Sequence, residues 1–351
     1  MFKYLGSKRV LVPVLEKLAK GSEAKTAVDL FTGTTRVAQA FKKQGIHTTA
    51  ADIASYSHVL AQTYIATDAK QIDGDELQQV IERLNALPGY DGYITRTYCE
   101  NARFFQPHNG RRIDAIRDTI EADYAHSPLR PLLLTSLLEA ADRVDSTTGV
   151  QMAYLKKWAP RSYRNMELRV PELIPGPGKA IHADATKLVR ELPATDLLYL
   201  DPPYNQHRYY TNYHIWETLV RWDAPQTYGV AQKRLDAREE HTKSIFNSKP
   251  RMKAAFFQLL QDANAQIVVV SYNNEAWITA EEMTRELYEN GHEDVRLLEF
   301  DHARYVGARI GIYNPEGKKT GKISHTRNKE WIFVAGPKDR VEAASAAVEG
   351  E

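Results

Sequence analysis

The chain has 351 residues, enough for one large α/β domain and a smaller second one. Its single cysteine, Cys99, excludes internal disulfides, and the sequence has no apolar run of about 18 residues that could span a membrane. Because the net charge is only +1, a nucleic-acid partner would have to be bound by local basic patches rather than by the whole molecule.

The first strongly patterned region is residues 26 to 44, which predicts a short strand, a turn that contains Gly33, and an amphipathic helix. A second strand is predicted from Ile46 to Ala51, and Asp52 follows at its end. An acidic residue about 20 positions beyond a glycine turn, at the tip of the next strand, is the arrangement that binds the ribose hydroxyls of a nucleoside cofactor.

The alternation of strands and helices stops between Asp68 and Gly178. An insert of about a hundred residues cannot be a structureless loop in a compact protein, so we predict a helical domain over residues 68–178. Its helices are predicted at Asp75–Leu87, Arg112–Tyr124 and Leu129–Val144.

Two stretches of this insert mix basic and aromatic residues. They run from Arg96 to Phe105, with Arg111 and Arg112 close behind, and from Lys156 to Arg164. Such side chains can neutralise phosphates and contact bases, although each run could also be a solvated helix face.

Residues 197 to 204 read Leu-Leu-Tyr-Leu-Asp-Pro-Pro-Tyr and form the most informative stretch of the chain. The apolar run predicts a buried strand of a parallel sheet, which ends at Asp201 because Pro202 and Pro203 stop further pairing. In open α/β sheets, ligands bind at this carboxyl end of the strands. The alternative is a proline-rich surface turn after a core strand.

The chemistry that suits this turn is activation of an exocyclic amino group such as that of adenine, which is a poor nucleophile because its lone pair is delocalised into the ring. The carboxylate of Asp201 and the carbonyl of Pro202 can each accept one of its two N–H hydrogens. This geometry directs the lone pair toward an electrophile. Tyr204 offers a flat face for the base, and such stacking contributes about 1–3 kcal/mol.

Beyond this turn the chain returns to recognisable elements. A polar stretch from Gln226 to His241 has weak apolar periodicity, which predicts a mobile segment. The basic stretch from Lys243 to Lys253 predicts an element that either distorts the DNA or contacts its target strand. The remaining predicted elements are a helix at Ile215–Arg221, a strand at Gln266–Ser271, a helix at Ala280–Glu289, a strand at Asp294–Asp301, a polar hairpin with Gly317 and Gly321, a strand at Glu330–Ala335 and a disordered tail at 337–351.

These motifs together resemble the alpha group of DNA adenine-N6 methyltransferases, which includes the Dam methylase and type II restriction-modification methylases. The octet from Phe2 to Arg9 is similar to the aromatic-x-Gly-x-Lys opening of that group, and Asp201 to Tyr204 to its Asp-Pro-Pro-Tyr motif. The turn at Gly33 resembles the first S-adenosylmethionine motif, with Thr35 in place of its second glycine. The segment from Ile181 to Ala185 matches the third motif.

The resemblance implies an α/β fold, namely a Rossmann-like S-adenosylmethionine-dependent methyltransferase sheet with an inserted, mainly helical target-recognition domain. Residues 1–67 and 179–336 would form the catalytic domain, and residues 68–178 would bind double-stranded DNA. Catalysis is implied for Asp201, Pro202, Pro203 and Tyr204. Contacts with S-adenosyl-L-methionine are implied for Tyr4, Gly6, Lys8, Asp29, Phe31, Gly33, Asp52, Ile53, Asp184 and Asp201. The candidate DNA-binding side chains are Arg103, Arg111, Arg112, Lys156, Lys157, Arg161, Arg164, Tyr210, Lys243 and Lys249.

Two other classes of function stay open. One is a methyltransferase of the same fold that acts on RNA adenine, protein glutamine or cytosine N4, and the other is a non-catalytic DNA-binding protein that retains the fold. Asp201 together with the large insert favours adenine of duplex DNA as the substrate, and the presence of both Asp201 and Tyr204 argues against the non-catalytic class. We expect a cytoplasmic monomer in a bacterial, archaeal or phage-infected cell, without a bound metal. Both a partner restriction endonuclease and an orphan role are compatible with the sequence.

Overall fold

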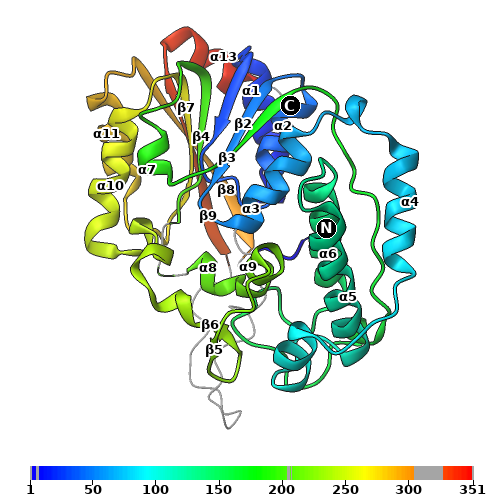
Figure 1. The fold of residues 1–351 in the computed structure, drawn as a ribbon. Helices are drawn as coiled ribbons and strands as arrows, with labels where there is room; N and C mark the ends of the chain where they lie inside the picture. Colours follow the sequence, from blue (N-terminus) through cyan, green and yellow to red (C-terminus); the bar gives the residue numbers. More distant parts are fainter. Residues whose placement is uncertain (1, 5–7, 204–205, 207, 304–326, 350–351) are drawn as a thin grey trace. The chain divides into compact units, whose positions relative to one another are not determined.

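The computed structural model describes residues 2–4, 8–203, 206, 208–303 and 327–349 (Figure 1). The chain forms two compact units, each assembled from three segments. Unit 1 consists of Met1–Val12, Thr32–Ala185 and His207–Ser244. Unit 2 consists of Pro13–Phe31, Thr186–Gln206 and Ile245–Glu351. The predicted insert of residues 68–178 therefore lies within unit 1.

Unit 2 contains five strands in the order β1-β4-β7-β9-β8. Strand β4 pairs in parallel with both β1 and β7, whereas β9 pairs antiparallel with β7 and β8. This arrangement confirms the buried strand before Asp201 and the antiparallel end of the sheet. The strands are β1 (Thr26–Asp29), β4 (Thr195–Leu200), β7 (Ala265–Asn273), β8 (Asp294–Ala303) and β9 (Arg327–Gly336).

The helices of unit 2 include one in the segment that we predicted to be a disordered tail. That prediction is wrong, because Lys338–Glu349 forms helix α13, in which Val341 and Ala344 are buried. A Cβ atom added at Gly21 would lie 2.8 Å from the carbonyl oxygen of Ala343, so this helix can pack closely at residue 21 because that residue is glycine. The other helices are α1 (Val12–Gly21), α7 (Ala185–Leu188), α10 (Lys249–Asp262), α11 (Ala280–Glu289) and the three-ten turn at Ile245–Asn247.

Unit 1 contains the parallel strands β2 (His47–Asp52) and β3 (Gly178–His182), with Asp52 opposite His182. A Cβ atom at Gly178 would lie 2.5 Å from the carbonyl oxygen of Ile65. Strand β3 can therefore approach that carbonyl only because residue 178 has no side chain. Two helices flank β2 in the sequence, namely α2 (Arg36–Lys43) and α3 (Ser55–Ala61), which continues as a π-helical turn at Gln62–Ala66.

The predicted helices of the insert are confirmed as α4 (Gly74–Asn85), α5 (Pro107–Tyr124) and α6 (Arg130–Val144). Helices α5 and α6 pack against each other (Figure 1), and α6 is buried on nearly every face. The remaining elements of unit 1 are a π-helical segment at Thr95–Glu100, α8 (Tyr209–Asn212), α9 (His214–Arg221), β5 (Thr227–Tyr228), β6 (Lys233–Arg234) and three-ten turns at Lys8–Val10, Ala69–Gln71, Pro160–Tyr163, Leu235–Arg238 and Glu240–Thr242.

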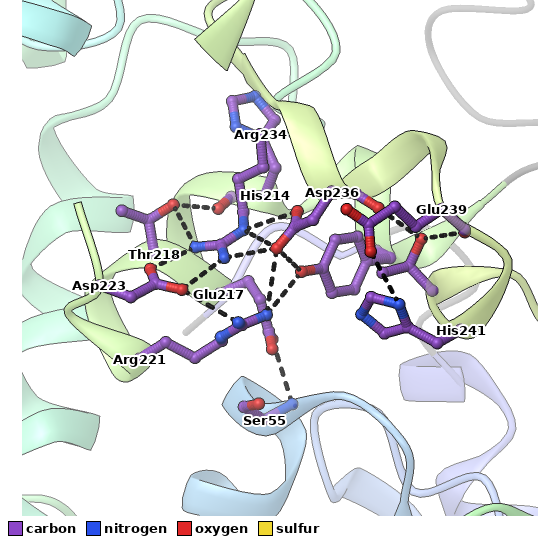
Figure 2. Close-up of polar contacts among 12 residues, drawn as sticks. Ser55, His214, Glu217, Thr218, Arg221, Asp223, Arg234, Asp236, Glu239 and His241 are labelled. Atoms are coloured by element: carbon purple, nitrogen blue, oxygen red, sulfur yellow. Dashed lines mark hydrogen bonds and ion pairs between the residues drawn. The ribbon is translucent and has the colours of Figure 1, made fainter. Parts of the chain in front are cut away.

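The polar stretch that we predicted to be mobile is instead held by Arg234. It forms the β5–β6 hairpin and two three-ten turns, and the Arg234 side chain is only 1% exposed. Figure 2 shows its guanidinium between two carboxylates, with Nη2 2.6 Å from Asp223 and 2.7 Å from Asp236. A paired and buried guanidinium fixes a segment whose apolar pattern is weak, which is why periodicity missed it.

His214 makes the stability of unit 1 sensitive to acid. Its ring is buried, and Nε2 lies 3.0 Å from the carbonyl oxygen of Gln151, so the neutral ring donates from Nε2. Burial, together with the cations of Lys233 and Arg234, lowers the pKa of His214 to about 3 despite the opposing hydrogen bond to the Gln151 carbonyl. Below pH about 6.5, His214 therefore becomes protonated in the unfolded chain but stays neutral in the folded protein.

We predict that the free energy of unfolding falls as the pH drops from about 6.5 toward 3, and that His214→Gln flattens this fall. One histidine accounts for up to about 1.4 kcal/mol per pH unit in this window. The measurement is urea unfolding of both proteins across this pH range. Identical slopes for wild type and variant would show that His214 is not the responsible group.

Candidate active site

The turn that follows the first strand of the chain is held to Asp52. Gly33 adopts a left-handed φ of 50°, and its N–H donates to Asp52 Oδ2 at 2.9 Å. The N–H of Ala54 donates to the other carboxylate oxygen, Oδ1, also at 2.9 Å. Backbone donors on two segments, one on each side of β2 in the sequence, thus fix both oxygens of one carboxylate.

The electrostatics of Asp52 suit a further hydrogen-bond donor. Burial raises the pKa of its carboxyl group, and the N–H groups of Ala54 and Gly33 oppose that rise. An ionised carboxylate offers about four acceptor positions, so Asp52 retains acceptor capacity beyond these two contacts. A sugar hydroxyl is a donor of the right kind, and the residues present therefore fit a nucleoside cofactor.

Tyr4 of the opening octet lies beside the same turn. A Cβ atom at Gly33 would lie 3.1 Å from the Tyr4 ring, so glycine is needed where the ring passes. Tyr4 stacks on Tyr213 with ring centroids 4.6 Å apart, and Tyr213 stacks on Trp216 at the same distance. Among the other opening candidates, Lys8 is buried, and Gly6 lies outside the described residues.

The other predicted cofactor residues of unit 1 follow β2 and β3. Ile53 is 51% exposed, which gives an apolar surface beside Asp52 that suits the flat face of a nucleobase. Nε2 of His182 lies 2.9 Å from the carbonyl oxygen of Ile53, and Asp184 is half-buried shortly after β3. The ends of these two paired strands therefore bring Asp52, Ile53 and His182 together.

The structure places three predicted cofactor residues in unit 2, namely Asp29, Phe31 and Asp201, of which Asp29 and Phe31 lie at or just after the end of β1. Asp29 is buried at the end of β1, and its Oδ1 accepts from the N–H of Phe31 at 3.3 Å. The Phe31 ring packs edge-on against Phe246 with centroids 5.2 Å apart. The Asp29 side chain thus caps the backbone turn that follows it. The Phe31 ring belongs to an aromatic cluster in which Phe246 also packs against Phe256.

The catalytic candidates follow β4 in unit 2. This strand is paired on both edges, with Leu198 opposite Val28 of β1 and Val268 of β7. Asp201 is half-buried directly after the strand, and Pro202 is buried. A carboxylate and a proline-stiffened backbone thus stand at the carboxyl end of a central strand, as expected. Tyr204 lies outside the described residues.

Several predicted DNA-binding side chains have protein partners instead. Arg161 donates to Oδ1 of Asp145 from Nε at 3.0 Å and from Nη2 at 2.7 Å, so two guanidinium donors share one oxygen of a buried acid. The other engaged side chains are Arg111 with Asp91, Arg112 with the Asn85 carbonyl, Tyr210 with Asp236, Lys243 with Glu240, and Arg103 over the Tyr154 ring.

The remaining basic candidates are on the surface. Lys156, Lys157, Arg164 and Lys249 are all exposed. Withdrawing Arg161 toward a phosphate would remove donors from buried Asp145, whereas these four side chains are already at the solvent-exposed surface.

Sequence reasoning missed Glu217, which lies on α9. Its side chain is buried, and Oε2 accepts from the N–H groups of Ser55 and Tyr56 at 3.1 and 3.4 Å. The only signal was an acid inside the apolar run from His214 to Val220. In the described part of the chain, no cluster of three or more metal-ligating side chains exists, and no helix is long and apolar enough to cross a membrane.

The chain is similar to several proteins of known class. It is 31% identical to the type II methyltransferase M.NlaIII of Neisseria lactamica over 93% of this chain and 99% of that protein. It is 29% identical to the type II methyltransferase M.CviAII of Paramecium bursaria Chlorella virus 1, covering 89% and 94%. It is also 31% identical to the modification methylase StsI of Streptococcus sanguinis, covering 85% of this chain but 48% of that longer protein.

The sheet is mostly parallel, Asp52 accepts a hydrogen bond from the glycine turn, and an Asp-Pro-Pro turn follows a central strand. Together these features define an S-adenosylmethionine-dependent methyltransferase. The sequence model of the D12 class N6 adenine-specific DNA methyltransferases matches residues 4–284. The chain belongs to this family. It is therefore an enzyme that transfers a methyl group from S-adenosylmethionine to N6 of adenine in DNA.

Proposed function

We propose that this enzyme methylates an adenine that it has flipped out of duplex DNA, within a specific base sequence. One observation carries the proposal, namely the position of Asp201 and Pro202 on a stiff turn after a strand that is paired on both edges. An adenine inside a duplex cannot reach such a turn, and extruding it costs a few kcal/mol.

In this proposal Asp201 and Pro202 prepare the nucleophile. The Asp201 carboxylate and the Pro202 carbonyl oxygen each accept one N–H of the adenine amino group, so the nitrogen is held nearer to tetrahedral geometry. S-adenosylmethionine, when bound, supplies an electrophilic methyl group. Because nitrogen becomes more acidic as it forms the new bond, a carboxylate that accepts its proton stabilises the transition state more than the ground state.

The cofactor is assigned mainly to the turn around Asp52. Its carboxylate, fixed by the N–H groups of Gly33 and Ala54, accepts from the ribose hydroxyls, and exposed Ile53 contacts the nucleobase. Tyr4 closes the turn on the side of Gly33. Asp184 stands as a second acid after the neighbouring strand β3.

DNA recognition is assigned to the helical region of residues 68–178 and to the basic stretch that begins at Lys243. The exposed cations Lys156, Lys157 and Arg164 would contact phosphates. Arg161 is left out of this set because its pairing with buried Asp145 gives it a structural role.

We predict that the triple variant Lys156→Gln, Lys157→Gln, Arg164→Gln binds DNA more weakly and with a flatter salt dependence. Each lost phosphate contact lowers the slope of log K against log salt by about 0.9. The measurement is a DNA titration across a salt series, with a cofactor titration beside it that should match wild type. A matched control removes three exposed cations of unit 2, at Lys25, Arg285 and Lys338. Equal slopes for the triple variant and this control would contradict the assignment.

The test of the function itself is transfer of a radiolabelled methyl group to mixed genomic DNA. Expression in a methylation-free host, followed by modified-base sequencing, should show N6-methyladenine within one short sequence. Label in RNA but not in DNA, or no label at all, would contradict the proposal and favour one of the two alternative classes.

The biological setting is also proposed. Relatives named as type II methyltransferases and modification methylases support a role beside a restriction endonuclease. We propose a monomer that acts in the cytoplasm of a bacterial or phage-infected cell, where its DNA substrate is found. Light scattering of the purified protein tests the monomer, and cleavage of unmodified DNA by the product of a neighbouring gene tests the endonuclease.

A further inference from the structure

Helix α3 begins directly after the Asp52 turn without a cap of its own. Its N-cap residue is Ala54, whose side chain cannot accept a hydrogen bond, so the first N–H groups of the helix need another acceptor. Glu217 of α9 provides it, because Oε2 accepts from the N–H groups of Ser55 and Tyr56. Figure 2 shows the Glu217 side chain directed at Ser55.

Burying the carboxyl group of Glu217 is unfavourable, and apolar packing does not compensate for its desolvation. The residue is 2% exposed and lies on a helix whose other buried side chains are mostly apolar. Burial raises the pKa of this carboxyl group, while the donors of Ser55 and Tyr56 and the cations of Arg221 and Arg234 oppose the rise. A buried carboxyl group needs hydrogen-bond donors to offset its desolvation, and here those donors are the first N–H groups of α3.

Residues at the start of α9 also support the glycine turn, which is the other backbone segment that donates to Asp52. Tyr213, at the N-cap of α9, and Trp216 within the helix form an aromatic stack with Tyr4, and Tyr4 lies against Gly33. The two backbone segments that donate to Asp52 are thus both supported from α9, one through Glu217 and one through the stack.

We propose that Glu217 is a positioning residue for cofactor binding: by capping α3 it holds the Ala54 N–H against Asp52 and so fixes the carboxylate for the ribose hydroxyls. This inference rests on the proposed role of Asp52. Glu217 itself touches neither cofactor nor DNA in this scheme. Its loss should therefore reduce the affinity for S-adenosylmethionine and leave the methyl-transfer step largely unchanged at saturating cofactor.

The experiment compares Glu217→Ala, Glu217→Asp and Glu217→Gln with wild type. We expect the Kd for S-adenosylmethionine, measured by calorimetry without DNA, to rise about tenfold in Glu217→Ala and severalfold in Glu217→Asp, whose shorter side chain cannot reach the helix. Glu217→Gln keeps an acceptor oxygen and should stay within about threefold. The kcat at saturating cofactor should change by less than about twofold in every variant.

The matched control is Glu286→Ala in unit 2, which removes another buried glutamate, one that accepts from Gln261 at 3.0 Å. It should lower Tm without changing the cofactor Kd. Wild-type affinity in folded Glu217→Asp protein would overturn the proposal. So would a further loss when Glu217→Asp is added to Asp52→Ala, because the positioned carboxylate is then already absent. If Asp52→Ala alone leaves the affinity unchanged, the proposed role of Asp52 fails first.

Discussion

Replacement of Asp201 by alanine should lower kcat by roughly 10²–10⁴-fold or more, because the proposed interaction with the amino-group hydrogens is strongest in the transition state. The protein should still fold, since Asp201 is half-buried after the end of β4 rather than inside the core. The measurement is single-turnover transfer of a labelled methyl group at saturating cofactor and DNA, with circular dichroism to confirm the fold.

A matched control lies at the opposite end of the same strand. Asp196 of β4 accepts from the backbone N–H groups of Lys25 and Thr26 at 2.8 and 2.9 Å. Asp196→Ala should therefore lower the free energy of unfolding by about 1–3 kcal/mol and leave kcat close to wild type. If Asp201→Ala methylates DNA at a rate near that of the control, the catalytic assignment of Asp201 is wrong.

Replacement of Asp52 by alanine should weaken S-adenosylmethionine binding by roughly tenfold to a hundredfold. Hydrogen bonds to a charged group contribute about 1.5–3 kcal/mol, and the variant also leaves the N–H groups of Gly33 and Ala54 without their acceptor. Calorimetric titration with cofactor alone measures the effect. Asp184→Ala is the comparison, because that acid is the other candidate for the ribose contact.

The pH dependence of binding gives a second readout on Asp52. Burial raises the pKa of its carboxyl group, and only the ionised form accepts from both hydroxyls. Cofactor affinity should therefore decline on acidification at a higher pH than for an ordinary aspartate, and Asp52→Asn should abolish this decline. Unchanged affinity in Asp52→Ala together with a loss in Asp184→Ala would transfer the ribose contact to Asp184.

The sequence by itself determined the elements with strong local patterns and the family to which the chain belongs. The apolar run before Asp201, the glycine turn and the strand before Asp52 each carry their signal within a few adjacent residues. The same holds for the three helices of the insert and for Ala280–Glu289, whose apolar periodicity extends over several turns.

Only the tertiary structure decided what the polar and small residues do. Arg161 belongs to a basic run, yet it pairs with Asp145, and Arg234 lies in a weakly patterned stretch, yet two carboxylates fix it. Helix α13 packs closely on α1 where Gly21 has no side chain, and Glu217 accepts from donors 161 and 162 positions away in the chain. Periodicity reports which face of an element is buried, whereas the partner of a charged or small side chain depends on segments that only folding brings together.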